Sequence, residues 1–404
     1  MRKASEDFDW SEISPTIFGA VFESTLNPET RRKGGMHYTS IENIHKVIDP
    51  LFLDDLRKEF EVIKTETVSR TRKTKLQQFQ NKLASIYWLD PAAGSGNFLT
   101  ETFLCIRRLE NEVIFELTGG QISIGEVYNP IKVSINQFYG IEINDFAVTV
   151  AKTALWIAES QMLKATEDIV HLSLDFLPLK TNANIIQGNA LQLDWNDIIP
   201  NDKLNYIMGN PPFVSKTGRT SASESHSAAM LTLDQKADKE LFFGKNAGLL
   251  DYVCCWYMKA ARYSKGSNIQ SAFVSTSSIC QGQQVEPLWK PLLEEGITIN
   301  FAYTNFKWIT EAEKGAYVYV VIVSFSHDNR NKPFLISGNN RTYVDSISPY
   351  LIEGEPILIA SRNKPICNVP EIGIGNKPID GGHYLFKKNE ASGMNVGARA
   401  PDPA

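Results

Sequence analysis

The sequence contains no apolar run that approaches the roughly 18 residues a membrane-spanning helix needs. Its first residues, Met1 to Asp7, also lack the apolar stretch of a signal peptide. We therefore expect a soluble, cytoplasmic protein. The chain has 404 residues, of which 43% are hydrophobic and 22% charged, so a disordered or fibrous chain is excluded and a large core is expected.

Cysteine and histidine are both scarce. The five cysteines are an odd number, lie far apart and form no C-x-x-C pair, which argues against a disulfide framework and against a zinc site. His45, His171, His327 and His383 have no partners at ligand spacing along the chain, so we predict no metal site. The formal net charge of −5 selects no class of partner, because a large domain can carry a basic groove within an acidic total.

The pattern of apolar residues predicts the fold. From Ile86 onward, short β-type runs alternate with longer helical patterns, which is typical of βαβ units and a parallel sheet. The predicted strands cover 86–89, 138–141, 184–186, 206–208, 272–275, 299–302 and 317–325, and the predicted helices cover 98–117, 146–163 and 250–263. We expect an α/β fold with a doubly wound, mainly parallel, seven-stranded sheet.

Three further segments have a recognisable character. Ser40 is placed as the N-cap of a helix that carries Ile41, Ile44 and Val47 on one face. Residues 57–82 contain eight Lys or Arg against three Glu, which fits either a contact with a phosphate backbone or an ordinary solvated helical face. Residues 215–248 are long and polar, as functional or disordered loops are.

A glycine turn follows the first predicted strand and begins a helix. Its residues are Asp90, Pro91, Ala92, Ala93, Gly94, Ser95, Gly96 and Asn97. The two glycines let the backbone approach a ligand at the carboxyl end of the strand, and Gly94→Val is expected to abolish binding by filling the turn. A dinucleotide site would have a third glycine, and a P-loop would have Gly-Lys-Ser/Thr. S-adenosylmethionine, which has no phosphate, therefore fits this turn better.

The second and third strands also end in polar residues. Glu142, followed by Ile143, stands at the tip of the second strand, where a carboxylate can accept hydrogen bonds from both ribose hydroxyls of an adenosine ligand. A carboxylate at this place could also simply favour the N-terminus of the next helix. Asn189 and Ala190 follow the third strand, where such folds contact the adenine ring.

The fourth strand ends in Asn210-Pro211-Pro212-Phe213, which predicts the chemistry. The exocyclic amine of a base is a poor nucleophile because its lone pair is delocalised into the ring. The Asn210 side-chain oxygen and the Pro211 carbonyl can accept hydrogen bonds from the two amine hydrogens, while the prolines fix the backbone and Phe213 offers a face for stacking. A base in a duplex must be flipped out to reach this pocket. The alternative is a turn that merely ends a strand.

The order of these motifs resembles the gamma class of amino-methyltransferases. In that class a Tyr-Thr element precedes the glycine loop and helps to hold the cofactor, which implies roles for Tyr38 and Thr39. Residues 250–253, 273–279 and 306–308 narrow the resemblance to the MmeI-like restriction-modification enzymes, as do the residues from 364 to 382. The resemblance implies a class I S-adenosylmethionine-dependent methyltransferase fold and N6-adenine methylation of double-stranded DNA.

Members of that family usually carry an N-terminal nuclease domain and a C-terminal target-recognition domain. We expect three segments here: an N-terminal helical lead over 1–34, the methyltransferase domain over 35–330, and over 331–404 a linker toward a target-recognition domain, with a tail of low apolar content. The chain is accordingly expected to be a methyltransferase core without its nuclease and recognition domains.

Three functions stay open at this point. The first is methylation of adenine N6 in DNA, with S-adenosylmethionine as cofactor. The second is methylation of another planar amine or amide, such as cytosine N4, guanine N2 in RNA or a protein glutamine. The third is a fragment that binds cofactor but is inactive without its recognition domain, because sequence-specific base contacts would come from elsewhere. No Pro-Cys dipeptide occurs, which argues against the cysteine chemistry of cytosine carbon-5 methylation.

Overall fold

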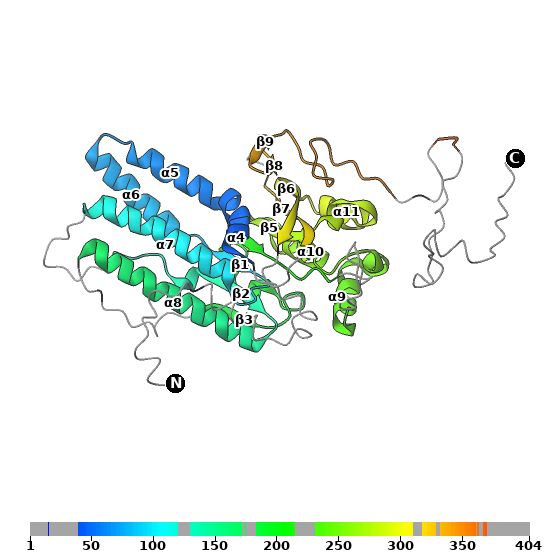
Figure 1. Cartoon of the computed structure of the whole chain (residues 1–404), viewed down its shortest axis with the longest axis horizontal. Helices are drawn as coiled ribbons and strands as arrows, with labels where there is room; N and C mark the ends of the chain where they lie inside the picture. Colours follow the sequence, from blue (N-terminus) through cyan, green and yellow to red (C-terminus); the bar gives the residue numbers. More distant parts are fainter. Residues whose placement is uncertain are drawn as a thin grey trace, which may run out of the picture. The chain divides into compact units, whose positions relative to one another are not determined.

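The structure is a computed structural model of the whole chain (Figure 1). It describes residues 15, 39–119, 130–171, 174, 183–214, 231–309, 317–328, 332–360, 362 and 367–369. Contacts divide the chain into one unit over 1–359 and a second over 360–404. Tyr38, nearly all of the expected helical lead and most of the expected linker and tail lie outside the described residues.

The centre of the first unit is a mixed sheet in the order β3-β2-β1-β4-β5-β7-β6-β8-β9. Its strands are β1 (Trp88–Asp90), β2 (Phe138–Glu142), β3 (Asn184–Gln187), β4 (Tyr206–Gly209), β5 (Gln270–Thr276), β6 (Thr298–Ile309), β7 (Tyr317–Ser326), β8 (Phe334–Ser337) and β9 (Asn340–Tyr343). The five neighbouring strands β3, β2, β1, β4 and β5 pair in parallel, and β7 is antiparallel to both β5 and β6. The seven predicted strands are confirmed. The described sheet has two more, because β8 pairs with β6 beyond residue 330.

Helices cover both faces of this sheet. The α-helices are α4 (Ile41–Ile48), α5 (Asp54–Lys64), α6 (Ser69–Ala84), α7 (Asn97–Thr118), α8 (Asp145–Val170), α9 (Leu233–Phe243), α10 (Cys254–Tyr263) and α11 (Val285–Glu294). Helices α5 to α8 run side by side and project past the sheet (Figure 1). Ser40 caps α4 as expected by position, but through its backbone carbonyl, since its side chain makes no capping bond.

Alternate strand residues point into two separate cores. Met208 and Val274 pack with α4 to α8 on one face. Ile207 and Phe273, their neighbours in sequence, pack with α10 and α11 on the other. Successive residues of a strand point to opposite faces of the sheet. Because both faces are buried, the strands are short, nearly continuous apolar runs in the sequence.

The connections reverse direction between β1 and β4. Helices α7 and α8 link β1 to β2 and β3 on one side, whereas α10 and α11 follow β4 and β5 on the other. Strands β1 and β4 are direct neighbours, with Trp88 opposite Tyr206 and Leu89 opposite Ile207. In doubly wound sheets a ligand crevice forms outside the carboxyl ends of the strands at this switch point. The residues that follow β1 and β4 therefore meet there.

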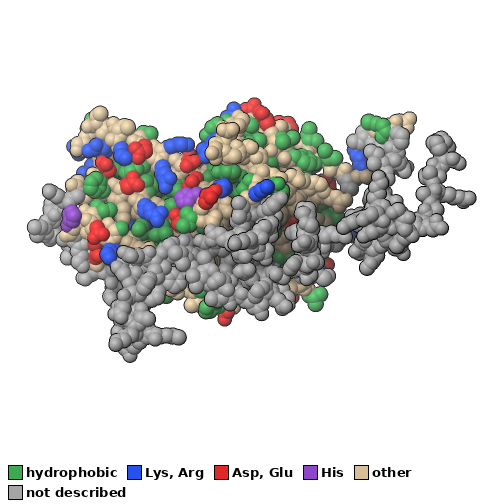
Figure 2. Space-filling view, viewed as in Figure 1, with side chains coloured by type: hydrophobic (Ala, Val, Ile, Leu, Met, Phe, Trp, Pro, Cys, Tyr) green, Lys and Arg blue, Asp and Glu red, His purple; other side chains and the backbone are tan. Residues whose placement is uncertain are grey.

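The basic segment 57–82 forms much of α5 and all but the last turn of α6. Four of its lysines pair with acids: Lys58 with Asp55, Lys64 with Glu61, Lys75 with Glu66, and Lys82 with Glu59. Figure 2 shows acidic and basic side chains interspersed over the described part of this face. This mixture favours a solvated helical face over a dedicated contact with phosphates.

No helix among the described residues combines the length and the apolar character needed to cross a membrane.

Candidate functional site

The glycine turn has the backbone that the sequence predicts. Gly94 has a φ of 53° and Gly96 a φ of 81°, both in the left-handed region that favours glycine. A Cβ on Gly96 would lie 2.8 Å from the Cβ of Ala151 in α8, so this position admits no side chain without movement. A Cβ on Gly94 would meet no described atom within 4 Å. The described protein therefore restricts this position only through its backbone conformation, and the expectation that a side chain at Gly94 blocks the cofactor stays a prediction.

Glu142 holds the turn from the tip of β2. One carboxylate oxygen accepts a hydrogen bond from the Gly94 backbone N–H at 2.9 Å, and the other accepts one from the Asn144 N–H at 2.9 Å. Burial raises the pKa of Glu142, although these backbone N–H groups oppose the rise. Each oxygen keeps a further lone pair, so the carboxylate can also accept from a ligand at the ends of the strands.

Asp90 lies deeper in the same crevice and is only 1% exposed. Burial, with a further contribution from the Glu142 charge, raises the pKa of Asp90 to about 8. The Ala92 N–H donates to an Asp90 carboxylate oxygen at 3.0 Å and partly offsets this rise. Two buried carboxyl groups near each other favour a cationic ligand, because a positive charge would stabilise both ionised forms.

Gly209, to which the sequence assigned no role, lies between the Asp90 carboxylate and Asn210. A Cβ at Gly209 would lie 2.5 Å from the carboxylate oxygen Oδ1 of Asp90. The end of β4 can therefore approach Asp90 only because residue 209 is glycine. The position of Gly209 directly before Asn210 was the available signal. Its consequence is that Asp90 lies against the residue that precedes the predicted catalytic asparagine.

The Asn210 side chain is held in one orientation by Thr39. Its Nδ2 donates a hydrogen bond to the Thr39 hydroxyl oxygen at 3.2 Å, and Thr39 is buried immediately before α4. The other end of the carboxamide, Oδ1, is buried and has no hydrogen-bond partner among the described residues. A buried acceptor without a partner costs about 1 to 3 kcal/mol, which a ligand N–H would recover. Asn210 therefore has an acceptor that the described protein leaves unused.

The rest of the Asn-Pro-Pro-Phe motif lies at the seam between the two cores. Pro211 is buried and Pro212 half-buried. The Phe213 ring is half-buried and contacts residues of both hydrophobic cores. The next residue, Val214, accepts a backbone hydrogen bond from Tyr252 at 3.1 Å. The motif is thus fixed at both ends while part of the Phe213 ring stays accessible.

Asn189 is anchored by a buried carboxylate that the sequence reading missed. Asp238 in α9 accepts hydrogen bonds from Asn189 Nδ2 at 3.0 Å, from Gln192 Nε2 at 3.0 Å and from the Tyr252 hydroxyl at 2.7 Å. Asp238 joins the loop after β3 to α9 and to the start of α10. No motif marks Asp238, because its three partners lie in other elements.

The remaining predicted cofactor residues follow the carboxyl ends of β1, β2 and β3. Gly188, which precedes Asn189, donates its N–H to the Glu142 carbonyl at 2.9 Å, so the ends of β2 and β3 adjoin. Ser95 and Asn97 are buried where α7 begins, and the Ser95 hydroxyl has no hydrogen-bond partner among the described residues.

The other predicted cofactor residues differ in exposure. Ala92 is half-buried and Ala190 is buried. Ile143 is 65% exposed beside Glu142. Of the predicted site residues, Tyr38 alone lies outside the described part of the chain.

Comparison with known proteins agrees with this arrangement. A family model described as MmeI, DNA-methyltransferase domain, matches residues 66–337. DNA methyltransferase A of Bacillus subtilis (strain 168) is 40% identical over 392 residues, which cover 96% of this chain and 42% of that protein. The structure of the type IIL restriction-modification enzyme MmeI in complex with DNA is similar, with a TM-score of 0.85 and 40% identity over 96% of this chain and 50% of that one.

These comparisons confirm the expected family and the expected class I methyltransferase fold. The chain spans half or less of the length of the two relatives.

Proposed function

This chain belongs to the MmeI DNA-methyltransferase domain family, and from that premise we propose that it transfers a methyl group from S-adenosylmethionine to N6 of adenine in DNA. The observation that carries the proposal is the buried, unpartnered Asn210 Oδ1, whose carboxamide Thr39 orients. Asn210 lies at the switch point of the sheet, directly after Gly209, which packs against Asp90.

Asn210 and Pro211 activate the amine. Asn210 Oδ1 accepts a hydrogen bond from one amine hydrogen and the Pro211 carbonyl accepts one from the other. As these bonds form, the nitrogen lone pair withdraws from conjugation with the ring and becomes available for attack on the methyl group. Because Thr39 fixes the carboxamide beforehand, the acceptor needs little reorganisation when the reaction occurs.

The crevice fits the proposed cofactor. S-adenosylmethionine supplies an electrophilic methyl group on a sulfonium centre. Glu142 offers a carboxylate to the ribose hydroxyls, and Gly94 and Gly96 keep the backbone close to the ligand. The unpartnered Ser95 hydroxyl gives a further polar contact, and the buried Asp90 and Glu142 favour a positively charged molecule. Tyr38, Ile143, Asn189 and Ala190 are proposed to complete the cofactor site.

The adenine reaches Asn210 by leaving the duplex. The accessible part of Phe213 stacks on the flipped base, and Pro212 keeps the ring at the seam between the two cores. The two relatives have further length to which this chain is not matched. We propose that a target-recognition domain, in the same protein or a partner, delivers the DNA.

Labelling the product tests the reaction. The chain is incubated with tritiated S-adenosylmethionine and mixed-sequence duplex DNA, which is then digested to nucleosides and separated by chromatography. We expect the label in N6-methyl-2′-deoxyadenosine. Label in N4-methylcytosine would overturn the adenine assignment. Cofactor binding by calorimetry without transfer to any base would instead support the inactive-fragment alternative.

A further inference from the structure

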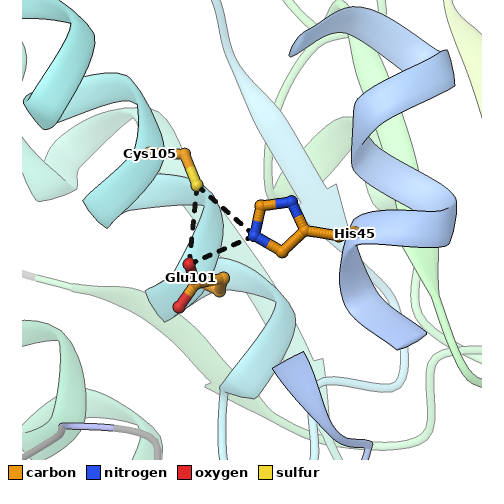
Figure 3. A group of neighbouring side chains, drawn as sticks. All are labelled: His45, Glu101 and Cys105. Carbon is orange, nitrogen blue, oxygen red and sulfur yellow. Dashed lines mark hydrogen bonds and ion pairs between the residues drawn. The ribbon is translucent and has the colours of Figure 1, made fainter. Parts of the chain in front are cut away.

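A cluster of three potential metal ligands lies between α4 and α7, outside the site described above (Figure 3). His45 comes from α4, while Glu101 and Cys105 are four residues apart on one face of α7. In sequence His45 has no partner at ligand spacing. In the fold, however, one ligand atom from each of the three residues lies within 4.8 Å of the other two.

The separations suit a single small ion. His45 Nε2 lies 3.4 Å from Glu101 Oε1 and 3.9 Å from Cys105 Sγ, and Cys105 Sγ lies 3.5 Å from Glu101 Oε1. Tetrahedral Zn²⁺ with bonds of about 2.0 to 2.3 Å places neighbouring ligand atoms about 3.3 to 3.8 Å apart. An ion could therefore be accommodated with shifts of a few tenths of an ångström at most.

A second carboxylate orients the histidine from behind. The Nδ1 of His45 lies 2.7 Å from Asp49 Oδ1, in the next turn of the chain. When Nδ1–H donates to that carboxylate, the lone pair of a neutral imidazole is on Nε2, which faces Glu101 and Cys105. This carboxylate–histidine pair is the usual support of a metal-binding histidine.

The surroundings already favour a positive charge. Glu101 and Cys105 are buried, at 4% and 3% exposure, and His45 is half-buried. Arg108 is the competing cation, since its guanidinium lies 3.4 Å from Glu101 Oε1, but its side chain is 55% exposed and free to move outward.

We propose that His45, Glu101 and Cys105 bind a thiophilic divalent ion of the Zn²⁺ class, with the fourth coordination position open to water. Thiolate and imidazole ligands select such ions over Mg²⁺ and Ca²⁺. Binding releases the thiol proton of Cys105 to solvent, because the thiolate is the ligand, while His45 binds through the lone pair on Nε2. Because α4 begins directly after Thr39 and Ser40, the ion fastens to α7 the segment that carries Thr39.

Cobalt titration tests the site directly. The chain is treated with chelator and carries Cys367→Ser throughout, because Cys367 is the exposed cysteine. Co²⁺ is then added, and we expect saturation at one equivalent with a thiolate-to-cobalt charge-transfer band in the near ultraviolet. Zn²⁺ should abolish the band, whereas Mg²⁺ in excess should not. Absence of the band, or its persistence in Cys105→Ser, would overturn the proposal.

Matched variants separate metal binding from loss of folding. Cys280→Ser, at another buried cysteine, should keep the band. Arg108→Ala should bind Zn²⁺ at least as tightly as the parent, because it removes the competing cation. Zn²⁺ should raise the Tm of the parent and of Arg108→Ala, but not that of His45→Gln, measured for each against its own metal-free sample. An equal rise in His45→Gln would also contradict the site.

Discussion

The cofactor side of the crevice and its acceptor side are held by different kinds of contact. At the ends of β1 and β2, the Asp90 and Glu142 carboxylates accept from backbone N–H groups only two residues away, at Ala92 and Asn144. At the end of β4, the Asn210 carboxamide depends on a hydroxyl 171 positions earlier in the chain. The first side combines local turns with the hydrogen bond from Gly94 N–H to Glu142, which joins the ends of two neighbouring strands, whereas the second depends on the docking of the N-terminal segment. Substitutions should therefore affect the two sides separately.

The largest expected effect is on the acceptor side. Asn210→Ala removes the free Oδ1 acceptor and should lower the methyl-transfer rate by about two to three orders of magnitude. The dissociation constant of S-adenosylmethionine should stay nearly unchanged, because the turn and Glu142 are intact. Single-turnover rates and calorimetry measure the two quantities, with the exposed Asn81→Ala as the control. Turnover near that of the parent would contradict the proposed mechanism.

The next effect belongs to the cofactor side. Gly96→Ala combines a left-handed backbone with a Cβ 2.8 Å from that of Ala151, so the turn and α8 must separate. We expect cofactor affinity to fall more than tenfold and the Tm to drop. Gly94→Ala meets no described atom within 4 Å, so its effect on the stability of the free protein should be limited to the backbone cost of about 1 to 2 kcal/mol.

Calorimetry and thermal unfolding of the two variants side by side measure this difference. If Gly94→Ala lowered cofactor affinity more than Gly96→Ala did, direct contact between the ligand and the turn, and not close packing against α8, would be what limits binding.

A smaller effect tests the link between the sides. Thr39→Val keeps the shape but removes the hydroxyl that accepts from Asn210 Nδ2. We expect a roughly tenfold lower transfer rate with unchanged cofactor affinity, because a freed carboxamide adds reorganisation to the reaction. Thr39→Ser should restore most of the rate. The family resemblance implies that Thr39 contacts cofactor, so a loss of cofactor affinity with an intact rate would favour that role instead.

The sequence predicts local elements better than contacts between distant ones. The strands at 138–141 and 206–208, and the glycine turn between strand and helix, follow from periodicity and local residue types, and the structure confirms them. Pairings such as Asp238 with Asn189, or Asn210 with Thr39, join elements far apart in the chain. No spacing rule reports them, because they depend on how the elements pack. Strands β8 and β9 escaped prediction for a related reason, since they are short and β9 is exposed along its whole length.

The last prediction concerns the buried carboxylate between the two sides and needs no substrate. Burial raises the pKa of Asp90 from 3.8 to about 8, so the folded chain binds this proton more tightly than the unfolded chain does. The stability that the proton contributes is fully present below about pH 4 and is lost as pH rises toward about 8. Asp90→Asn cannot ionise, so its Tm should exceed that of the parent by a few degrees near pH 8 and by less near pH 5.

Thermal unfolding of the parent, Asp90→Asn and the exposed Asp202→Asn across that range measures the difference. A difference in Tm that is constant with pH would mean that Asp90 is already ionised in the folded chain. Its negative charge would then be balanced within the protein, and the preference of the crevice for a cationic cofactor would have to come from Glu142 alone. Growth of the difference toward pH 8 would instead show that the free protein keeps Asp90 neutral. In that case a cation in the crevice should expel the proton, and cofactor binding should release a proton measurable in buffers of different ionisation enthalpy.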